Sequence, residues 1–190
     1  MSLICKPFVF VRHGETPLNR DKLIGGRTDV PLTEEGERQA RAAAPLLSGW
    51  EWNGVAVSSL QRARRTLELA LPGVPHVVVD DLRERDWGLL ENRPIAELPP
   101  YESTPPWGES WEQFSTRVTG ALNGLLEQYD LPLIVAHSGV FRVIRYYASG
   151  TPYGDRVGNV VPMWISPGQT EEEWQIVPLS DSSWQLGRQL

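Results

Sequence analysis

Two arginines and two histidines follow closely on short hydrophobic stretches of this sequence: Arg12, His13, Arg62 and His137. Arginine presents a planar fork of donors that fits tetrahedral oxyanions, and two arginines on one anion indicate phosphate. A neutral histidine is a competent nucleophile toward phosphorus when a backbone acceptor holds one ring nitrogen. A second histidine can hydrogen-bond a non-bridging oxygen and stabilise the charge of the transition state. These residue types predict chemistry on a phosphoryl group.

Such a reaction also needs an acid for its leaving group. The segment "DDLRERDWGLLENR" supplies five candidates: Asp80, Asp81, Glu84, Asp86 and Glu91. The acid must donate a proton to the leaving oxygen and then take one from water. The residues alone do not choose among the five carboxylates.

The four side chains need elements that bring them together, and the chain alternates predicted strands with predicted helices. Strands are expected at 8–11, 54–58, 76–79 and 133–136, and a closing hairpin at 160–165 and 174–178 around "SPGQT", before a loose tail at 182–190. Helices are expected at 33–47 with Thr33 as N-cap, at 60–70 capped by Ser59, and at 140–148 stopped by Gly150. Another helix opens at Ser110, where Gln113 completes a capping box.

This alternation predicts an α/β fold, a three-layer sandwich in which helices cover both faces of a mostly parallel sheet. Ligands of such folds bind at the carboxyl ends of the strands. Arg12 and His13 follow the first predicted strand, Arg62 follows the second, and His137 follows the strand "LIVA". We therefore expect them to converge at one edge of the sheet.

Length and composition limit the classes of protein to consider. A chain of 190 residues suits one domain, 1–190, with a loop-rich cap region at about 80–110 that is dense in proline and tryptophan. Its one cysteine, Cys5, excludes an internal disulfide framework and fits a reducing compartment. A net charge of −6 argues against general binding of nucleic acid or an anionic membrane. With no apolar run long enough for a signal peptide or a span, a cytoplasmic protein is expected.

The motif "VRHGETPLN" resembles the signature of the histidine phosphatase superfamily, which includes the cofactor-dependent phosphoglycerate mutases. Further segments are similar to that family in the same order: "TDVPLTEEGERQA", "SSLQRARRTLELA", "LRERDWG", "GESWEQFSTRV" and "VAHSGVFRVI". The resemblance implies a phosphoglycerate mutase-like fold, no cofactor or metal, and His13 as the nucleophile that becomes phosphohistidine. It implies that the phosphoryl group is bound by Arg12, Asn19, Arg62 and His137. It also implies that Glu84 is the proton donor.

Within that family the sequence favours a phosphatase over a mutase. Trp87 stands where the mutases have a tyrosine, and Ile95 stands where they have a lysine. The long insertion and the paired arginines of the mutases have no evident counterpart. The expected activity is that of a phosphoric monoester hydrolase, a metal-independent histidine acid phosphatase-like enzyme. Its substrate would be a small phosphorylated metabolite, such as a sugar phosphate or a ribazole phosphate.

Three alternatives stay open. One is phosphoryl transfer of the phosphoglycerate mutase type, and the second is a non-catalytic module that binds a phosphorylated ligand. The third concerns specificity, since Trp87 and Trp107 lie in the cap region and either line a substrate pocket or pack elsewhere. Exposed tryptophans also leave room for a homodimer.

Overall fold

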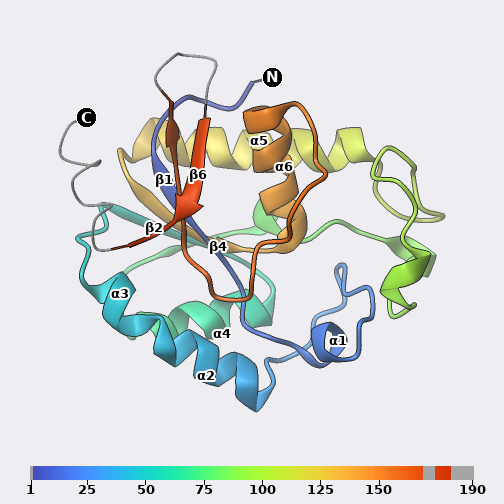
Figure 1. Ribbon diagram of the computed structural model, residues 1–190, viewed down its shortest axis with the longest axis horizontal. Coiled ribbons are helices and arrows are strands. Elements are labelled where there is room, and N and C mark those ends of the chain that lie inside the picture. Colours follow the sequence, from blue (N-terminus) through green and yellow to red (C-terminus); the bar gives the residue numbers. More distant parts are fainter. Residues whose placement is uncertain (1, 169–173, 181–190) are drawn as a thin grey trace.

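The computed structural model describes residues 2–168 and 174–180. Within these ranges a six-stranded sheet crosses the molecule in the order β3-β2-β4-β1-β5-β6 (Figure 1). Its strands are β1 (Phe8–Arg12), β2 (Gly54–Ser58), β3 (Val77–Val79), β4 (Pro132–Ala136), β5 (Met163–Pro167) and β6 (Trp174–Pro178). The first four strands are parallel to one another, and β5 and β6 add an antiparallel pair at the edge beside β1. The predicted α/β fold with a mostly parallel sheet is confirmed, although the whole sheet is mixed.

Helices cover both faces of the sheet (Figure 1). The helices α5 (Trp111–Gln128) and α6 (Ser138–Ser149) lie on one face. The helices α2 (Glu34–Ala42), α3 (Ala44–Ser48) and α4 (Gln61–Ala70) lie on the other. A short helix, α1 (Pro17–Arg20), follows β1, and three single turns of 3₁₀ helix occur at Asp80–Leu82, Gly88–Leu90 and Ile95–Glu97.

The two faces of β1 belong to two separate hydrophobic clusters. Phe8 and Phe10 pack in the cluster that contains Phe114 of α5, whereas Val9 and Val11 pack in the cluster that contains Leu67 of α4. Side chains alternate across a strand, so a strand buried on both sides reads as a continuous apolar run. Burying each such side chain contributes about 1.5–3 kcal/mol. This burial on both faces fixes where β1 ends and where its first polar residues emerge.

Helix boundaries differ from the prediction at two places. The expected helix at 33–47 is two helices, because α2 ends at Ala42 and Pro45 has no amide hydrogen with which to continue the ladder. Thr33 does cap α2, accepting a hydrogen bond from the amide of Gly36. Ser59, however, does not cap α4: Leu60 occupies that position, and the Ser59 hydroxyl bonds the carboxylate of Asp80 instead.

The start of α5 and the end of α6 agree with the sequence. Ser110 and Gln113 form the capping box of α5, and Gly150 ends α6 in the left-handed conformation at φ 75°. The strand expected to begin at residue 160 begins at Met163, because Val160 has a φ of 51° and its amide donates to the carbonyl of Arg12. The hairpin of β5 and β6 is confirmed, while most of its connection, 169–173, and the expected tail, 182–190, lie outside the described residues.

Candidate active site

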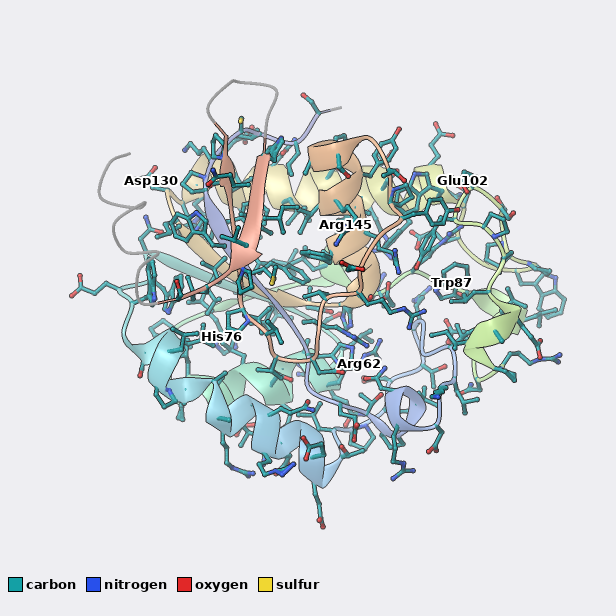
Figure 2. All side chains as sticks on the ribbon, in the orientation of Figure 1. Arg62, His76, Trp87, Glu102, Asp130 and Arg145 are labelled. Atoms are coloured by element: carbon teal, nitrogen blue, oxygen red, sulfur yellow. The ribbon has the colours of Figure 1, made fainter. Side chains whose placement is uncertain are left out.

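A cavity of about 380 Å³ opens at the carboxyl ends of β1, β2 and β4. The sequence-predicted residues Arg12, His13, Asn19, Arg62 and Glu84 all line it. Figure 2 shows Arg62 near this edge of the sheet and Trp87 on the loop-rich segment beside it. The cavity is large enough for a small metabolite. The sequence predicted that these residues meet at the carboxyl edge, because they follow the ends of predicted strands.

The pairing of β1 with β4 places the two histidines side by side. Arg12 lies opposite Ala136, and the amide of His13 donates to the carbonyl of Ala136 at 3.0 Å. The residue that directly follows each of these strands is a histidine, and the ring centroids of His13 and His137 lie 5.2 Å apart. Parallel strands in register therefore turn two sequence-distant histidines into neighbours.

His13 is held as a neutral imidazole with one nitrogen free. Its Nδ1 lies 2.7 Å from the carbonyl oxygen of Gly14, which can only accept, so Nδ1 carries the proton. Burial, then the charges of Arg62 and Arg12, hold the pKa of His13 well below its ordinary value of 6.5. Nε2 therefore keeps its lone pair at neutral pH, and the ring is 4% exposed, within the cavity lining. This is the state that a nucleophilic histidine requires.

His137 is fully buried, next to Ser58 at the end of β2. Its Nε2 lies 2.7 Å from the hydroxyl oxygen of Ser58, and that oxygen also accepts a hydrogen bond from the amide of Leu60 at 3.4 Å. Burial, followed by the charge of Arg62, lowers the pKa of His137 well below 6.5. A neutral ring that accepts at Nε2 carries its hydrogen on Nδ1. Within the described part of the chain Nδ1 is buried and has no hydrogen-bond partner, and in this tautomer it would be a donor. His137 is not itself among the residues that line the cavity.

The two arginines are fixed by backbone carbonyls. Arg62 is 3% exposed, and its two terminal nitrogens donate to the carbonyls of Gly26 and Thr28 at 2.7 and 2.8 Å. Arg12 donates to the carbonyl of Val157 at 3.0 Å. Burial lowers the pKa of Arg12 to about 10, with the charge of Glu84 acting in the opposite direction. Both guanidinium groups therefore stay charged at neutral pH, in fixed orientations suited to one oxyanion.

Of the five candidate acids, Glu84 alone is among the residues that line this cavity. Its two carboxylate oxygens accept from the amides of Arg85 at 2.8 Å and Gly139 at 2.9 Å. Asp86 instead pairs with Arg27. Asp80 pairs with Arg83, and Glu91 accepts from the backbone of residues 27 and 28. Among the five candidates, Glu84 therefore has the position that the expected proton donor needs, and its role as the acid stays a prediction.

Asn19 is set by a capping box of its own. The Thr16 hydroxyl accepts from the amide of Asn19, and the Asn19 side chain accepts from the amide of Thr16. Asn159 donates to the carbonyl of His13 at 2.8 Å and lies 3.4 Å from the Asn19 side-chain oxygen. The capping box of the short helix α1 therefore fixes Asn19 at the cavity lining.

The two tryptophans of the cap region behave differently. Trp87 is 5% exposed, lines the cavity, and meets the ring of Tyr101 edge to face at 5.7 Å. Trp107 is 87% exposed and borders another surface depression, beside Arg27 and Glu112. Trp107 is therefore not among the residues that line this cavity, and the turn that contains it is closed by a hydrogen bond from the amide of Gly108 to the carbonyl of Pro105.

Several supporting residues were not predicted: Lys22, Ser58, Thr66, Tyr101, Arg156 and Asn159. Ser58 had a readable signal, since it is the last residue of a buried strand and a hydroxyl there points to the ligand edge. Thr66 lies one helical turn after Arg62 and accepts from the amide of Gly14 at 2.9 Å. Lys22 and Arg156 lie in irregular segments, where no periodicity indicates which way a side chain faces.

Residues 2–168 and 174–180 contain neither a cluster of metal-binding side chains nor a helix that could span a membrane. No group of three or more histidine, cysteine, aspartate or glutamate side chains gathers there in a way that could hold a metal ion. None of the helices in these ranges combines the length and the apolar character that a membrane span requires.

The match to a known family extends over most of the chain. The histidine phosphatase superfamily (branch 1) matches residues 8–159, which include each of the site residues described above. The chain belongs to the histidine phosphatase superfamily. It is 32% identical over 183 residues to the uncharacterized phosphatase PhoE of Bacillus subtilis, covering 93% of each chain.

Solved structures of other family members share the fold. The alpha-ribazole phosphatase of Shigella flexneri superimposes with a TM-score of 0.78 at 28% identity, over 92% of this chain and 96% of that one. A phosphoglycerate mutase of Thermus thermophilus superimposes with a TM-score of 0.71 at 31% identity, over 92% and 98%. The chain is therefore similar to members of this family that carry both phosphatase and mutase names.

Proposed function

We propose that this histidine phosphatase family member hydrolyses a small phosphomonoester through a phosphohistidine on His13, without a metal ion. The observation that carries the proposal is the hydrogen bond from Nδ1 of His13 to the carbonyl of Gly14. It fixes the tautomer in which Nε2 is the free nitrogen of the ring, in a site whose other groups suit a phosphoryl group. The non-catalytic module left open above would not need this arrangement.

In the first step, Nε2 of His13 attacks phosphorus while the bond to the leaving oxygen breaks. Glu84 in its acid form gives its proton to that oxygen, so the product leaves as an alcohol. Arg12, Arg62 and Nδ1–H of His137 hold the non-bridging oxygens, where charge develops in the transition state. Each of these donors is fixed in advance by a backbone carbonyl or by Ser58, so little reorganisation is needed.

In the second step, water attacks the phosphohistidine and the bond between nitrogen and phosphorus breaks. Glu84 takes the proton from that water, which restores the acid form, and inorganic phosphate leaves. His13 returns to its neutral state with Nδ1 still bonded to Gly14. The cycle balances without any other reactant.

Water is the proposed acceptor for reasons that come from the cavity wall. Trp87 and Ile95, at positions where the mutases have polar side chains, both line the cavity. The wall at these two positions therefore offers no group that would hold an acidic product for return of the phosphoryl group. The similarity to a phosphoglycerate mutase keeps phosphoryl transfer as the second candidate. We also propose that the protein is cytoplasmic.

The test uses p-nitrophenyl phosphate and 3-phosphoglycerate, each with chelator present. We expect release of inorganic phosphate from p-nitrophenyl phosphate in EDTA, and none from His13→Ala. Conversion of 3-phosphoglycerate to 2-phosphoglycerate without phosphate release would favour the mutase. Loss of activity in EDTA, or full activity of His13→Ala, would refute the mechanism.

A further inference from the structure

The backbone that leads to Glu84 is held by one side chain of α5. Nη1 of Arg117 donates to the carbonyls of Asp81 at 2.8 Å and Arg83 at 3.0 Å. Nη2 of the same guanidinium donates to the carbonyl of Glu84 itself at 3.1 Å. Three carbonyls within the segment 81–84 therefore converge on one arginine, and the last of them belongs to the proposed proton donor.

The carboxylate of Glu109 fixes the orientation of this guanidinium. It accepts from Nε of Arg117 at 2.6 Å and from Nη2 at 2.9 Å, which is the bidentate geometry of an arginine–carboxylate pair. The two side chains are only 17% and 15% exposed, so the pair is largely shielded from water. With these bonds each of the five N–H groups of Arg117 has an acceptor. A lysine could not make this set of contacts, because it lacks the planar fork.

Glu109 also binds the far end of the same loop. Its amide donates to the carbonyl of Asp86 at 2.9 Å, and its carboxylate accepts from the amide of Asp86 at 3.3 Å. Its own carbonyl accepts from Nε of Arg85 at 3.0 Å. Arg117 therefore holds residues 81–84 and Glu109 holds the residues that follow, both from the start of α5.

The carboxylate of Glu84 depends on this backbone for its position. Its oxygens accept from the amide of Arg85 within the loop and from the amide of Gly139 at the start of α6. The second bond joins two separate elements, so it is kept only if the loop stays fixed relative to α6. Loops move more than the elements that they connect, and a misplacement of about 1 Å can cost about 100-fold in rate. A fixed loop is therefore needed for an acid that must meet the leaving oxygen.

Other arginine–carboxylate pairs of the chain do not hold backbone. Three of them hydrogen-bond carboxylates and no backbone carbonyl in the described ranges 2–168 and 174–180: Arg41, Arg65 and Arg93. Arg117 combines the pair with three carbonyls, and all three lie in the segment that ends at Glu84. The contacts of Arg117 thus point to the placement of that residue.

We propose that Arg117, oriented by Glu109, is a positioning residue for the proton donor Glu84. By fixing the backbone of residues 81–84, it keeps the carboxylate on the amide of Gly139 and facing the leaving group. Arg117 is not among the residues that line the catalytic cavity, so it acts through Glu84 and not on the substrate. The inference rests on the proposed function, because it takes Glu84 as the acid of that reaction.

The test measures kcat/KM on two aryl phosphates of similar size, p-nitrophenyl phosphate and p-methylphenyl phosphate. The first releases a phenolate that leaves without a proton, whereas the second releases a more basic phenolate that needs the proton of Glu84. Arg117→Lys keeps the positive charge and removes the fork. We expect kcat/KM to fall about 10- to 100-fold for p-methylphenyl phosphate and less than about 3-fold for p-nitrophenyl phosphate. An equal loss on the two esters, or no loss, would overturn the inference.

A split between kcat and KM separates positioning from a loss of folded protein. Hydrolysis of the phosphohistidine uses Glu84 as the base whichever ester is supplied. For p-nitrophenyl phosphate, kcat and KM of Arg117→Lys should therefore fall together while phosphoenzyme accumulates. A fall in kcat with KM unchanged would indicate less active protein and would contradict positioning.

A second variant and a control complete the comparison. Glu109→Gln keeps the shape of the side chain but replaces one acceptor oxygen with an NH₂ group, so it should shift both esters in the same direction by a smaller factor. It also tests the inference if Arg117→Lys does not fold, which thermal unfolding checks. Arg41→Lys replaces an arginine that bonds only the carboxylate of Glu37, and it should change neither ester. Failure of Glu109→Gln to discriminate between the esters would contradict the role of the pair.

Amide hydrogen exchange, followed by NMR, reports the position of Glu84 without turnover. The amides of Arg85 and Gly139 should exchange at least about 10-fold faster in Arg117→Lys than in the wild-type protein, while those of β4 stay unchanged. If this is seen but the wild-type protein hydrolyses no phosphomonoester, Arg117 still positions Glu84 and the proposed function fails. If the wild-type protein hydrolyses both esters but neither exchange nor the ester ratio changes in the variant, the inference fails and the phosphatase stands.

Discussion

Gly139 holds the proposed proton donor, and replacing it with alanine should impair proton donation specifically. Its amide donates to one carboxylate oxygen of Glu84 at 2.9 Å. A Cβ at this position would lie 1.9 Å from the other carboxylate oxygen and 3.1 Å from the ring of Phe114. Phe114 is fully buried, so the relief must come from Glu84. Gly139→Ala therefore moves the carboxylate and breaks its bond to the start of α6.

The size of the effect follows from the bond that is lost. A hydrogen bond to a charged group contributes about 1.5–3 kcal/mol, which corresponds to about 10- to 150-fold in rate. Esters whose alcohol needs a proton to leave should lose this whole factor in kcat/KM. p-Nitrophenyl phosphate should lose far less, because p-nitrophenolate leaves without a proton. The assay is kcat/KM of the variant on glycerol 3-phosphate and on p-nitrophenyl phosphate.

Gly124→Ala is the matched control. It lies in α5, where an added Cβ meets nothing within 4 Å, so activity should not change and helix propensity should rise. Thermal unfolding of both variants checks that each is folded. An equal loss on the two substrates, or no loss, would show that Gly139 does not set the position of the acid or that Glu84 is not the acid.

Three other outcomes are expected. The free energy of unfolding should fall as pH drops below 6.5, by about 1.4 kcal/mol per pH unit for each buried histidine. The reason is that the histidines of the unfolded chain become protonated in this range, whereas folded His13 and His137 stay neutral. Urea titrations at pH 7.5 and 5.5 measure the difference, and equal stabilities at the two pH values would contradict the prediction. Arg62→Lys should lower kcat/KM for p-nitrophenyl phosphate about 100-fold or more, because lysine lacks the guanidinium group that can bond two carbonyls and the anion at once. A decrease of less than 5-fold would contradict the role of Arg62 in binding the phosphoryl group. Trp87→Ala should raise KM for sugar phosphates whereas Trp107→Ala should not, and steady-state kinetics showing the reverse would contradict the assignment of the cavity wall.

The buried part of the fold could be predicted from the sequence because both faces of the central strands are covered. Apolar runs such as "FVFV" and "LIVA" indicate buried strands whose ends can be located from the sequence. The residues that follow these strands lie at the same edge of the sheet, at the carboxyl ends of its parallel strands. The sequence therefore predicts that His13 and His137 lie close together, and the structure has their ring centroids 5.2 Å apart. The choice of Glu84 among five acids came from resemblance, and the geometry of the cavity agrees with it.

What the sequence did not predict lies in segments without periodicity. Trp87 and Trp107 look equivalent in the sequence, yet Trp87 is buried against Tyr101 whereas Trp107 is 87% exposed. Ser59 has the residue type of a helix cap, but an available carboxylate at Asp80 takes its hydroxyl. The burial of a loop side chain and the choice of its hydrogen-bond partner depend on which residues are nearest in space. The residues that are adjacent in the sequence do not indicate this.

The most direct test of the account is a rapid-quench trap of the phosphoenzyme. The wild-type protein, mixed with radiolabelled phosphomonoester and quenched in alkali, should carry up to one phosphate per chain. The label should be stable in alkali, labile in acid, and mapped to the peptide that contains His13. Since His13→Asn lacks the nucleophile, it should carry none while still binding inorganic phosphate. Turnover by the wild-type protein with no acid-labile label, or a label on any other residue, would contradict the account.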